Sequence, residues 1–505
     1  MKKIATLVLA AGLVLGCVSG ANAIDFKAKG QWIMSFDYGQ NLGFTGGSGI
    51  RGAGKNNEDE FEAKQRVRLQ LDAVASEALS GTVYFEIGRQ FWGKAENGAA
   101  LGADGQQVKV KNAYIDWMIP NTDAKVRMGI QGLSLPSFTT GSQIFRDDVA
   151  AVVANYKLNE NVGLTALWAR PYNDNFAGRA DKSRVSYMDN MDMFALLVPL
   201  TFDGVKVTPW AMYASIGPNT FRKDNNYLGN FDGVSKSYAR SGLFALGGAH
   251  HRDGSDADVA ALGSYGDAWW FGLTGQVSLL DPLRISWDFN YGATNYEESR
   301  LNRRGWLASL LLEYKMDWGV PGLYGWYGSG DDGNPANGSE RMPYISTGNT
   351  NNGFSNFAFN GAPYDHTRES ILGYSMAGTW GIGARVKDVS FVENLKHTLR
   401  INLMGGTNAP AMARKMMSAD WGLQPNKTST VGKDPLYMTT NDTALELGLT
   451  NSYKMYENFT VYLEGSYIAT WLDGNSKRWG SSKLNGKSDN VRDPWNINLS
   501  FVYAF

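Results

Sequence analysis

Residues 61–72 read FEAKQRVRLQLD, and apolar and polar side chains alternate through almost all of this stretch. Phe61 and Leu69 fall on one parity, whereas Arg66 and Arg68 fall on the other. A helix would scatter these residues around its circumference, but a β-strand places them on two opposite faces. The stretch therefore predicts a strand with one apolar face and one charged face.

The same period of two recurs along the rest of the chain, in about eighteen segments. Each segment is long enough for a strand that crosses a bilayer, which needs about 9–11 residues. The predicted strands lie near residues 24–39, 60–75, 80–92, 108–119, 124–131, 149–158, 161–171, 190–202, 204–216, 266–280, 282–295, 303–317, 320–330, 372–388, 395–406, 441–455, 458–472 and 492–505.

The connections between these segments alternate between short and long. Asp203-Gly204 and Asp281-Pro282 are turn sequences, whereas the segments 217–265, 331–371 and 408–440 are long, polar and rich in Gly, Asn and Asp. This asymmetry is typical of outer-membrane barrels, which have short periplasmic turns and long external loops. Beyond residue 23 no stretch is apolar for about 20 residues, so a membrane role would have to use strands.

The N-terminus has the pattern of a secretory signal. Lys2 and Lys3 precede an apolar run over residues 4–15, and Ala21-Asn22-Ala23 is a small-x-small cleavage site. We predict a cleaved signal peptide over residues 1–23, export through the general secretory pathway, and one barrel domain over residues 24–505. An alternative is lipidation of Cys17, because residues 14–17 resemble a weak lipoprotein box.

Composition excludes several classes of protein. The net charge is -1, so there is no basic excess to attract nucleic acid. One Cys and four His give little material for a disulfide scaffold or a zinc site, and we expect no metal and no cofactor. Aromatic residues make up 12% and hydrophobic residues 43%, which is too apolar for a disordered chain.

Charges in the middle of predicted strands distinguish a membrane barrel from a soluble β-protein. A soluble β-sandwich, a propeller or tandem jelly rolls would also alternate, but with the apolar face buried. Here Arg127, Asp288 and Glu464 must face water, while aromatic residues near segment ends suit two membrane interfaces. We predict an all-β fold: a transmembrane antiparallel up-and-down β-barrel of 16–18 strands, eighteen by count, in an outer membrane. The aromatic residues are Trp32, Tyr38, Trp117, Trp168, Trp269, Trp471 and Trp495.

Two parts of the sequence resemble a known family. The last segment ends on aromatic residues, and Phe501, Tyr503 and Phe505 resemble the C-terminal signal that the outer-membrane assembly machinery reads. AYIDW at 113–117 and VRMGIQ at 126–131, followed by a loop over 132–148, resemble the Gram-negative general porins. The resemblance is nearest to the homotrimeric porins of sulfate-reducing bacteria.

The resemblance implies a function and an assembly. It implies a non-enzymatic, water-filled channel for passive diffusion of small hydrophilic solutes and ions, in an outer-membrane homotrimer. It also implies that loop 132–148 folds inward and narrows the channel. General porins usually have sixteen strands, so a count of eighteen keeps open a substrate-selective channel, for example for small organic anions.

Strand parity selects the side chains that would line the water-filled interior. The resemblance places Asp147 and Asp148 on the inward loop, opposite Arg66, Arg68 and Arg127 on the wall. The alternative is that both acids lie at the outer rim and the basic residues merely solvate the wall. The predicted basic residues are Lys64, Arg66, Arg68, Arg127, Arg284, Arg385 and Arg400, and the acidic residues are Asp116, Asp147, Asp148, Asp288 and Glu464.

Other motifs have plainer explanations. GSGIRG at 47–52 fits a nucleotide-binding pattern, but no helix follows it, as such a site requires. His250-His251 lies in a long loop where a solvated polar segment is the default and a metal site the alternative. His397 has outward parity, and no nucleophile motif accompanies it. An energised transporter would need a plug domain before the first strand, and an adhesin would need a passenger region.

Overall fold

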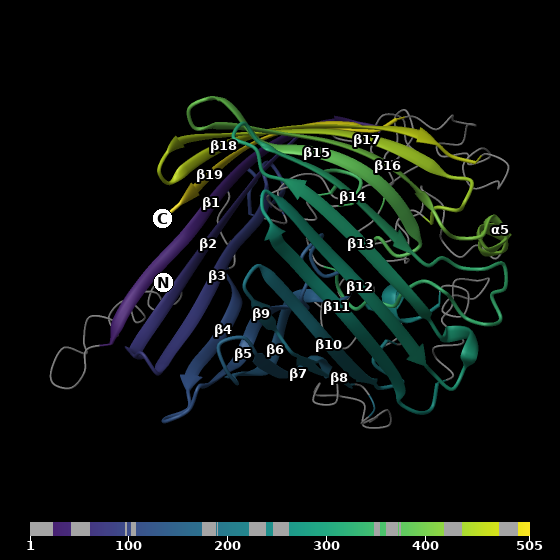
Figure 1. Cartoon of the computed structure of the whole chain (residues 1–505), viewed down its shortest axis with the longest axis horizontal. Helices are drawn as coiled ribbons and strands as arrows, with labels where there is room; N and C mark the ends of the chain where they lie inside the picture. The colour runs from purple at the N-terminus through teal and green to yellow at the C-terminus, as the bar shows by residue number, and fades with distance from the viewer. Residues whose placement is uncertain are drawn as a thin grey trace.

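The computed structural model describes residues 24–41, 61–95, 98–102, 108–173, 188, 190–221, 239–245, 262–347, 354–359, 372, 375–418, 437–473 and 493–505. These residues form one barrel of oblique antiparallel strands (Figure 1). The strands are β1 (Asp25–Gln40), β2 (Phe61–Ser76), β3 (Leu79–Phe91), β4 (Lys109–Met118), β5 (Ala124–Ser134), β6 (Arg146–Lys157), β7 (Gly163–Asn173), β8 (Asn190–Leu197), β9 (Leu200–Phe202), β10 (Val205–Ile216), β11 (Gly266–Leu280), β12 (Leu283–Asn295), β13 (Arg304–Tyr314), β14 (Val320–Gly328), β15 (Thr379–Val392), β16 (Leu395–Gly406), β17 (Thr443–Tyr456), β18 (Phe459–Trp471) and β19 (Trp495–Ala504).

Hydrogen bonding joins the nineteen strand segments into one sheet, which closes where β1 pairs with β19. β8 and β9 both pair with β10, so they are two parts of one barrel strand, and the barrel has 18 strands. The interruption falls at Val198 and Pro199, where the proline has no N–H to donate to a ladder. The predicted count of eighteen is confirmed.

The two ends of the barrel differ in their connections. At one end the strands are joined by short turns, as at 203–204, 393–394 and 457–458. At the other end the connections are long, as between β10 and β11 or between β14 and β15. Both ends of the barrel domain meet at the short-turn end, where the Gly30 N–H donates to the Phe505 carbonyl at 2.6 Å. This is the predicted pattern of short turns and long loops.

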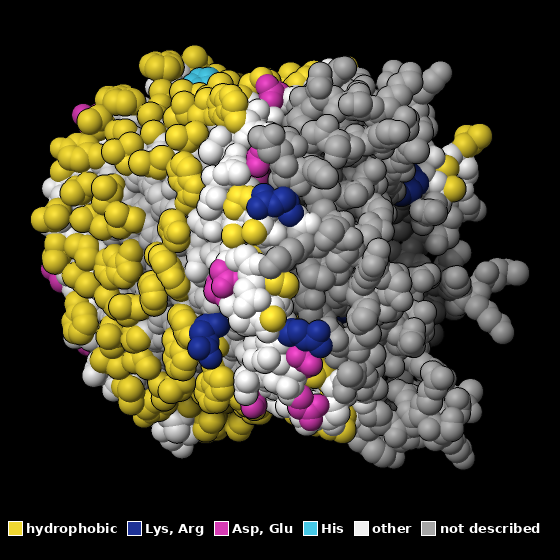
Figure 2. Space-filling model, turned by 90° about the vertical axis from the view of Figure 1, so that its right-hand side faces the viewer, with side chains coloured by type: hydrophobic (Ala, Val, Ile, Leu, Met, Phe, Trp, Pro, Cys, Tyr) yellow, Lys and Arg dark blue, Asp and Glu magenta, His cyan; other side chains and the backbone are white. Residues whose placement is uncertain are grey.

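Side chains on one parity cover the outside of the barrel and are mostly apolar. On β1, Trp32 and Tyr38 are exposed, whereas the alternate residues Ser35 and Asp37 are buried inside. Figure 2 shows the apolar outer face, bordered on the side of the loops by a band with Lys, Arg, Asp and Glu side chains. An apolar band next to a polar rim is the surface expected of a barrel in lipid.

Several of the 59 glycines lie beneath aromatic rings of the neighbouring strand. Trp210 of β10 pairs directly with Gly272 of β11, and Trp326 of β14 pairs with Gly381 of β15. A Cβ atom at either glycine would overlap the indole ring. The glycines therefore let large rings lie flat against the adjoining strand, which stabilises the pairing. The same relationship holds for Trp270 with Gly292, Tyr324 with Gly383, Trp287 with Gly275 and Trp380 with Gly405.

The inner wall is not polar all the way round. From β6 to β10 most inward positions are occupied by apolar residues, with Lys206 and Thr208 among the exceptions, which differs from the charged inner face predicted from β2. Apolar residues of the external connections pack on this part of the wall, so the interior contains a hydrophobic core beside its polar surface. The wall residues include Val149, Ala151, Met193, Trp210 and Met212, and the residues packed with them include Leu135, Ile144 and Phe145.

Helical segments are few and lie in the connections. Among the described residues they include the 3-10 turn η4 (Ser299–Leu301), the helix α5 (Pro410–Ser418) and a helical stretch over 239–243. In the part of the chain that the structure describes, no helix has the length and apolar character needed to cross a membrane.

Two boundaries differ from the sequence-based expectation. β6 begins at Arg146, because its pairing with β5 continues as far as Ser134, so the connecting loop covers only 135–145. β15 begins at Thr379 rather than at residue 372, because Leu372 and Met376 are buried in the core of the interior. The predicted signal peptide, Cys17, the GSGIRG stretch and His250-His251 lie outside the described residues.

Candidate functional site

The loop between β5 and β6 folds into the barrel and reaches another part of the wall. The backbone N–H groups of Phe138 and Thr139 donate to the carboxylate of Asp288 at 2.9 and 3.1 Å, and the Ser137 hydroxyl donates to it at 2.5 Å. Asp288 lies on β12, which is five barrel strands away from β6. Residues 135–145 therefore extend across the interior rather than away from the barrel.

A second stretch inside the barrel comes from the connection between β14 and β15. The Phe354 ring stacks on the inward-facing ring of Tyr324, with ring centroids 4.2 Å apart. The Tyr324 hydroxyl donates to the Phe354 carbonyl at 2.8 Å. The backbone N–H groups of Asn356 and Phe357 donate to Glu446 of β17 at 2.9 and 2.8 Å. Residues 354–359 are thus fixed to the wall formed by β14–β17.

A buried arginine joins this connection to two others. Arg303, between η4 and β13, donates from Nη1 to the Ser241 carbonyl at 2.6 Å and from Nη2 to the Met342 carbonyl at 3.2 Å. Its Nε donates to the Arg341 carbonyl at 3.3 Å. Ser241 lies between β10 and β11, so one guanidinium group connects three external connections into a single unit.

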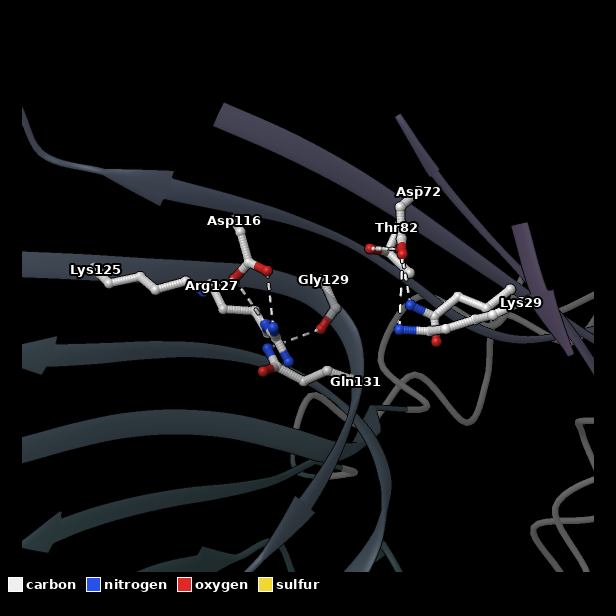
Figure 3. Close-up of polar contacts among 9 residues, drawn as sticks. Lys29, Asp72, Thr82, Asp116, Lys125, Arg127, Gly129 and Gln131 are labelled. Atoms are coloured by element: carbon white, nitrogen blue, oxygen red, sulfur yellow. Dashed lines mark hydrogen bonds and ion pairs between the residues drawn. The ribbon is translucent and has the colours of Figure 1, made fainter. Parts of the chain in front are cut away.

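The opposite part of the inner wall, from β1 to β5, carries a strip of paired charges. Arg127 donates from Nε and Nη2 to the two carboxylate oxygens of Asp116 at 2.8 and 2.7 Å, and Lys125 lies 3.5 Å from the same carboxylate (Figure 3). Arg68 donates to Glu86 at 2.6 Å. In both pairs the two residues face each other directly across neighbouring strands.

The strip continues toward the short-turn end of the barrel. Lys29 of β1 lies 3.8 Å from the Asp72 carboxylate, which also accepts from the Thr82 hydroxyl at 2.7 Å (Figure 3). Four basic side chains of the strip, Lys29, Arg68, Lys125 and Arg127, keep part of their surface exposed, for example 33% for Arg127. The strip therefore presents water-accessible charges of both signs in alternation, which orders water without a large net field.

A second charged group lies on β12, β13 and β15. Glu313 is bound by Arg284, by Arg385 at 2.9 Å and by Lys387 at 2.7 Å. The carboxylate is 2% exposed, whereas Arg284 is 42% and Lys387 is 29% exposed. One carboxylate shared by three cations leaves an excess of positive charge, and this excess faces the interior water.

A third group lies beside residues 354–359. Arg400 donates to the Asn356 side-chain carbonyl at 2.8 Å and to the Thr450 hydroxyl at 3.3 Å. The same hydroxyl lies 3.3 Å from Glu464. Both residues were predicted to line the water, but Glu464 is buried, and Arg400 is half-buried and contacts the inner loop through Asn356.

The remaining predicted basic residues belong to the strip on β2. Lys64 is buried 2.6 Å from Glu62, with its ammonium group over the Phe91 ring. Arg66 is also buried on the inward face. Their inward parity agrees with the alternation from which they were predicted.

The predicted pair of loop acids has a different environment from the one implied by resemblance. Asp147 and Asp148 lie in β6 and not in the loop. Asp147 accepts from the Ser346 hydroxyl at 2.7 Å, and Asp148 binds Lys111 and accepts from Asn112 at 2.8 Å. Their partners are therefore a neighbouring connection and β4.

The C-terminal aromatic residues lie at the closing seam of the barrel. Phe501 contacts Phe36 of β1 edge-on, with ring centroids 6.1 Å apart, and Tyr503 pairs with Trp32. The Phe505 ring lies over Gly30. The signal-like residues thus pack against the first strand.

No metal centre is found among the described residues. They contain no group of three or more His, Cys, Asp or Glu side chains able to hold an ion. His397 of β16 lies with its Nδ1 atom 2.7 Å from the Asn451 side-chain oxygen.

Sequence reasoning missed the residues that hold the inner loops. Nothing in the alternation marks Ser137 or Thr139, because they lie outside any strand. Arg303 was missed for the same reason. Glu313 and Glu446 were not missed, because their inward parity places them on the inner wall, but parity does not show which residues they bind.

Together these features define a class of protein: a transmembrane β-barrel with an apolar outer belt and a partly polar, loop-filled interior. No family model matches the chain, and no curated protein matches it.

Solved structures of similar shape are known. Pseudomonas aeruginosa OccK11 (OpdR) is 11% identical, with a TM-score of 0.49 over 95% of this chain and 96% of that one. Pseudomonas aeruginosa OccK10 (OpdN) is 11% identical, with a TM-score of 0.49 over 95% and 99%. Acinetobacter baumannii OccAB3 is 8% identical, with a TM-score of 0.47 over 95% and 100%.

These similarities are distant. The identities are 11% or less and the TM-scores 0.49 or less, so the fold assignment rests on the strand pairing of this chain. The three structures come from Pseudomonas and Acinetobacter, and the resemblance to the homotrimeric porins of sulfate-reducing bacteria is not confirmed.

Proposed function

We propose that this protein is a passive channel of a Gram-negative outer membrane that conducts small hydrophilic solutes and ions. The observation that carries the proposal is the strip of water-accessible ion pairs on the inner wall from β1 to β5, enclosed by a barrel with an apolar exterior. Barrels of about 16–18 strands are wide enough for an aqueous channel, and here part of the inner wall is charged.

The channel is proposed to be selective rather than general. Residues 135–145 and 354–359 occupy part of the interior, and apolar residues pack against the wall from β6 to β10. Solutes are thereby confined to the polar side of the interior, near β1–β5 and β12–β15. A narrow polar route discriminates between solutes by size and charge more sharply than a wide open pore does.

The charge of the route supports small organic anions as the preferred solutes. Glu313 is surrounded by Arg284, Arg385 and Lys387, and two of these cations are exposed to the interior. The strip on β1–β5 is balanced by comparison, because Arg127 and Arg68 each have a carboxylate partner. The excess positive charge would raise the local concentration of anions.

Export and assembly complete the proposal. We expect cleavage after Ala23, insertion by the outer-membrane assembly machinery through the strand that carries Phe501, Tyr503 and Phe505, and assembly as a homotrimer. The partners would be outer-membrane lipid, further copies of the chain and small solutes.

Single-channel conductance of the purified protein in a planar lipid bilayer tests the proposal. We expect ohmic insertion steps and, in a salt gradient, a reversal potential on the anion-selective side. Closure in thirds at high voltage would support the trimer. If correctly folded, heat-modifiable protein gives no conductance with salt, the channel proposal is wrong.

A further inference from the structure

Two inner loops are attached to the wall by the same kind of contact. In each case a buried carboxylate on an inward-facing strand position accepts hydrogen bonds from consecutive backbone N–H groups of the loop. Asp288 of β12 accepts from Phe138 and Thr139, and Glu446 of β17 accepts from Asn356 and Phe357. We call these two residues the wall carboxylates.

Asp288 uses both carboxylate oxygens. Oδ1 accepts from the Phe138 N–H and from the Thr274 hydroxyl, while Oδ2 accepts from the Ser137 hydroxyl and from the N–H and hydroxyl of Thr139. The residue is 3% exposed, so these groups replace water around the charge. Hydrogen bonds to a buried charge are stronger than those between neutral groups.

Glu446 is 1% exposed and is equally well supplied with donors. Its Oε1 accepts from the Asn356 and Phe357 N–H groups, and its Oε2 accepts from the Asn402 side-chain amide at 2.9 Å. Asn402 in turn donates to the Phe354 carbonyl at 2.5 Å. The carboxylate and its neighbour on β16 therefore hold the backbone of this stretch from both sides.

The two connections also hold each other. The Met376 N–H donates to the Gln143 side-chain oxygen at 3.1 Å, and the Ile345 N–H donates to the Ile144 carbonyl at 2.9 Å. The Arg146 N–H donates to the Ser346 carbonyl at 2.7 Å. The obstruction inside the barrel is thus one connected body, attached to the wall at Asp288 on one side and at Glu446 on the other.

We infer that Asp288 and Glu446 are the positioning residues that set the cross-section of the channel, by fixing this connected body to the wall. The inference rests on the proposed channel function. Neither carboxylate needs to touch the solute, because both are covered by the loops. Their role is to keep the loops on one side of the interior, so that the polar route on the other side keeps one width.

The amide variants Asp288→Asn and Glu446→Gln test this role at almost unchanged volume. Each replaces an acceptor oxygen with an NH2 group that faces N–H or O–H donors, which removes hydrogen bonds and adds repulsion. We expect larger and noisier single-channel steps, about 1.5- to 2-fold above the wild-type conductance, because current follows the open width. The conductance of the double variant should exceed that of either single variant.

A matched control is Asp493→Asn, at the external end of β19. Asp493 also accepts several hydrogen bonds, from the Tyr467 hydroxyl at 2.6 Å and from the Thr470 N–H and hydroxyl at 2.9 Å each. Asp493 holds neither inner loop, so the Asp493→Asn channel should have the same conductance as the wild-type channel. A rise in this variant would show that any lost carboxylate perturbs the pore.

A reversible lock provides the complementary test. The hydroxyls of Thr139 and Ser309 lie 2.6 Å apart, so Thr139→Cys with Ser309→Cys should form a disulfide between loop and wall. The sequence has no cysteine besides Cys17. In the Asp288→Asn background, the oxidised pair should restore the wild-type conductance, and a reductant should raise it again.

The outcomes separate this inference from the channel proposal. If wild-type protein conducts but Asp288→Asn and Glu446→Gln, both heat-modifiable, conduct like wild type, the inference is overturned and the channel stands. If wild-type protein does not conduct, the channel proposal fails first. If Asp288→Asn does not fold, the double variant Ser137→Ala with Thr139→Val is the substitute, because it removes the two loop hydroxyls and leaves the wall unchanged. We expect it to raise the single-channel conductance in the same way.

Discussion

Arg127 and Asp116 form a two-pronged ion pair on the inner wall, with Nε and Nη2 of the guanidinium 2.8 and 2.7 Å from the two carboxylate oxygens. They face each other directly across β5 and β4. The Arg127 guanidinium also lies over the Tyr114 ring, 4.1 Å from its centroid. The pair therefore has a fixed geometry while it stays in contact with water.

Replacing Asp116 with Asn should make the channel more selective for anions. The change leaves Arg127 without its carboxylate, and a unit charge about 5 Å away in water is worth roughly 0.8 kcal/mol. That energy corresponds to about a fourfold change in local ion occupancy, so the reversal potential in a potassium chloride gradient should shift toward chloride. Arg127→Gln should shift it in the opposite direction; equal shifts of one sign would contradict the prediction.

Replacing Gly30 with Ala should impair closure of the barrel. A Cβ atom at Gly30 would overlap the Phe505 ring and lie 2.7 Å from the Arg68 carbonyl. We expect a smaller fraction of heat-modifiable, folded protein on gels after refolding into detergent. Gly465→Ala is the matched control, since a Cβ there meets no atom within 4 Å. Equal folding yields for the two variants would show that the glycine is not required at the seam.

Replacing Arg303 with Lys should loosen the external connections without opening the barrel. Lysine cannot reproduce three directed bonds to the carbonyls of Ser241, Arg341 and Met342, and each buried unpaired carbonyl costs about 1–3 kcal/mol. Limited proteolysis of folded protein should cut the external connections several-fold faster. Arg300→Lys, at an exposed neighbour, should leave the cleavage rate unchanged; similar rates in both variants would contradict this role.

Asp493 should make the external end of the closing seam sensitive to acid. Although partial burial raises its pKa, hydrogen bonds from Tyr467 and Thr470 bring the pKa below the ordinary value of 3.8. A carboxyl with a lowered pKa stabilises the folded state above its unfolded pKa and loses this effect as the pH falls through its folded pKa.

Asp493→Asn should therefore lower the urea midpoint in detergent at pH 7, by roughly 1 kcal/mol for such a partly solvated group. At pH 3 and below, the difference from wild type should shrink. A difference that stays constant between pH 7 and pH 3 would mean that the carboxylate charge does not stabilise the seam.

The strands could be predicted from the sequence because each repeats one simple rule. Residues 61–72 alternate, and β2 presents Arg66 and Arg68 to the interior as the alternation requires. The turn sequence Asp203-Gly204 correctly predicted the boundary between β9 and β10. The rule fails where the interior is itself apolar, because Trp210 and Met212 look outward-facing by composition although they are buried inside.

The candidate site was less predictable, because its contacts join residues far apart in the sequence. Ser137 and Asp288 are 151 residues apart, and neither alternation nor turn chemistry relates them. Arg400 and Glu464 had the right parity, but parity cannot tell whether a loop covers the wall. The end of the inner loop was misplaced because β5 and β6 pair farther than their alternation shows, as far as Ser134 with Arg146.

The apolar inner wall from β6 to β10 has a consequence for biogenesis. A strand such as β10 (Val205–Ile216) has apolar side chains on both faces, as buried strands of soluble proteins do. Before the barrel closes, such a strand exposes both apolar faces to water, and this raises its tendency to aggregate. If the chain is exported unfolded as proposed, the region from β6 to β10 needs the most protection, and we expect periplasmic chaperones to bind peptides from β10 more tightly than peptides from β2.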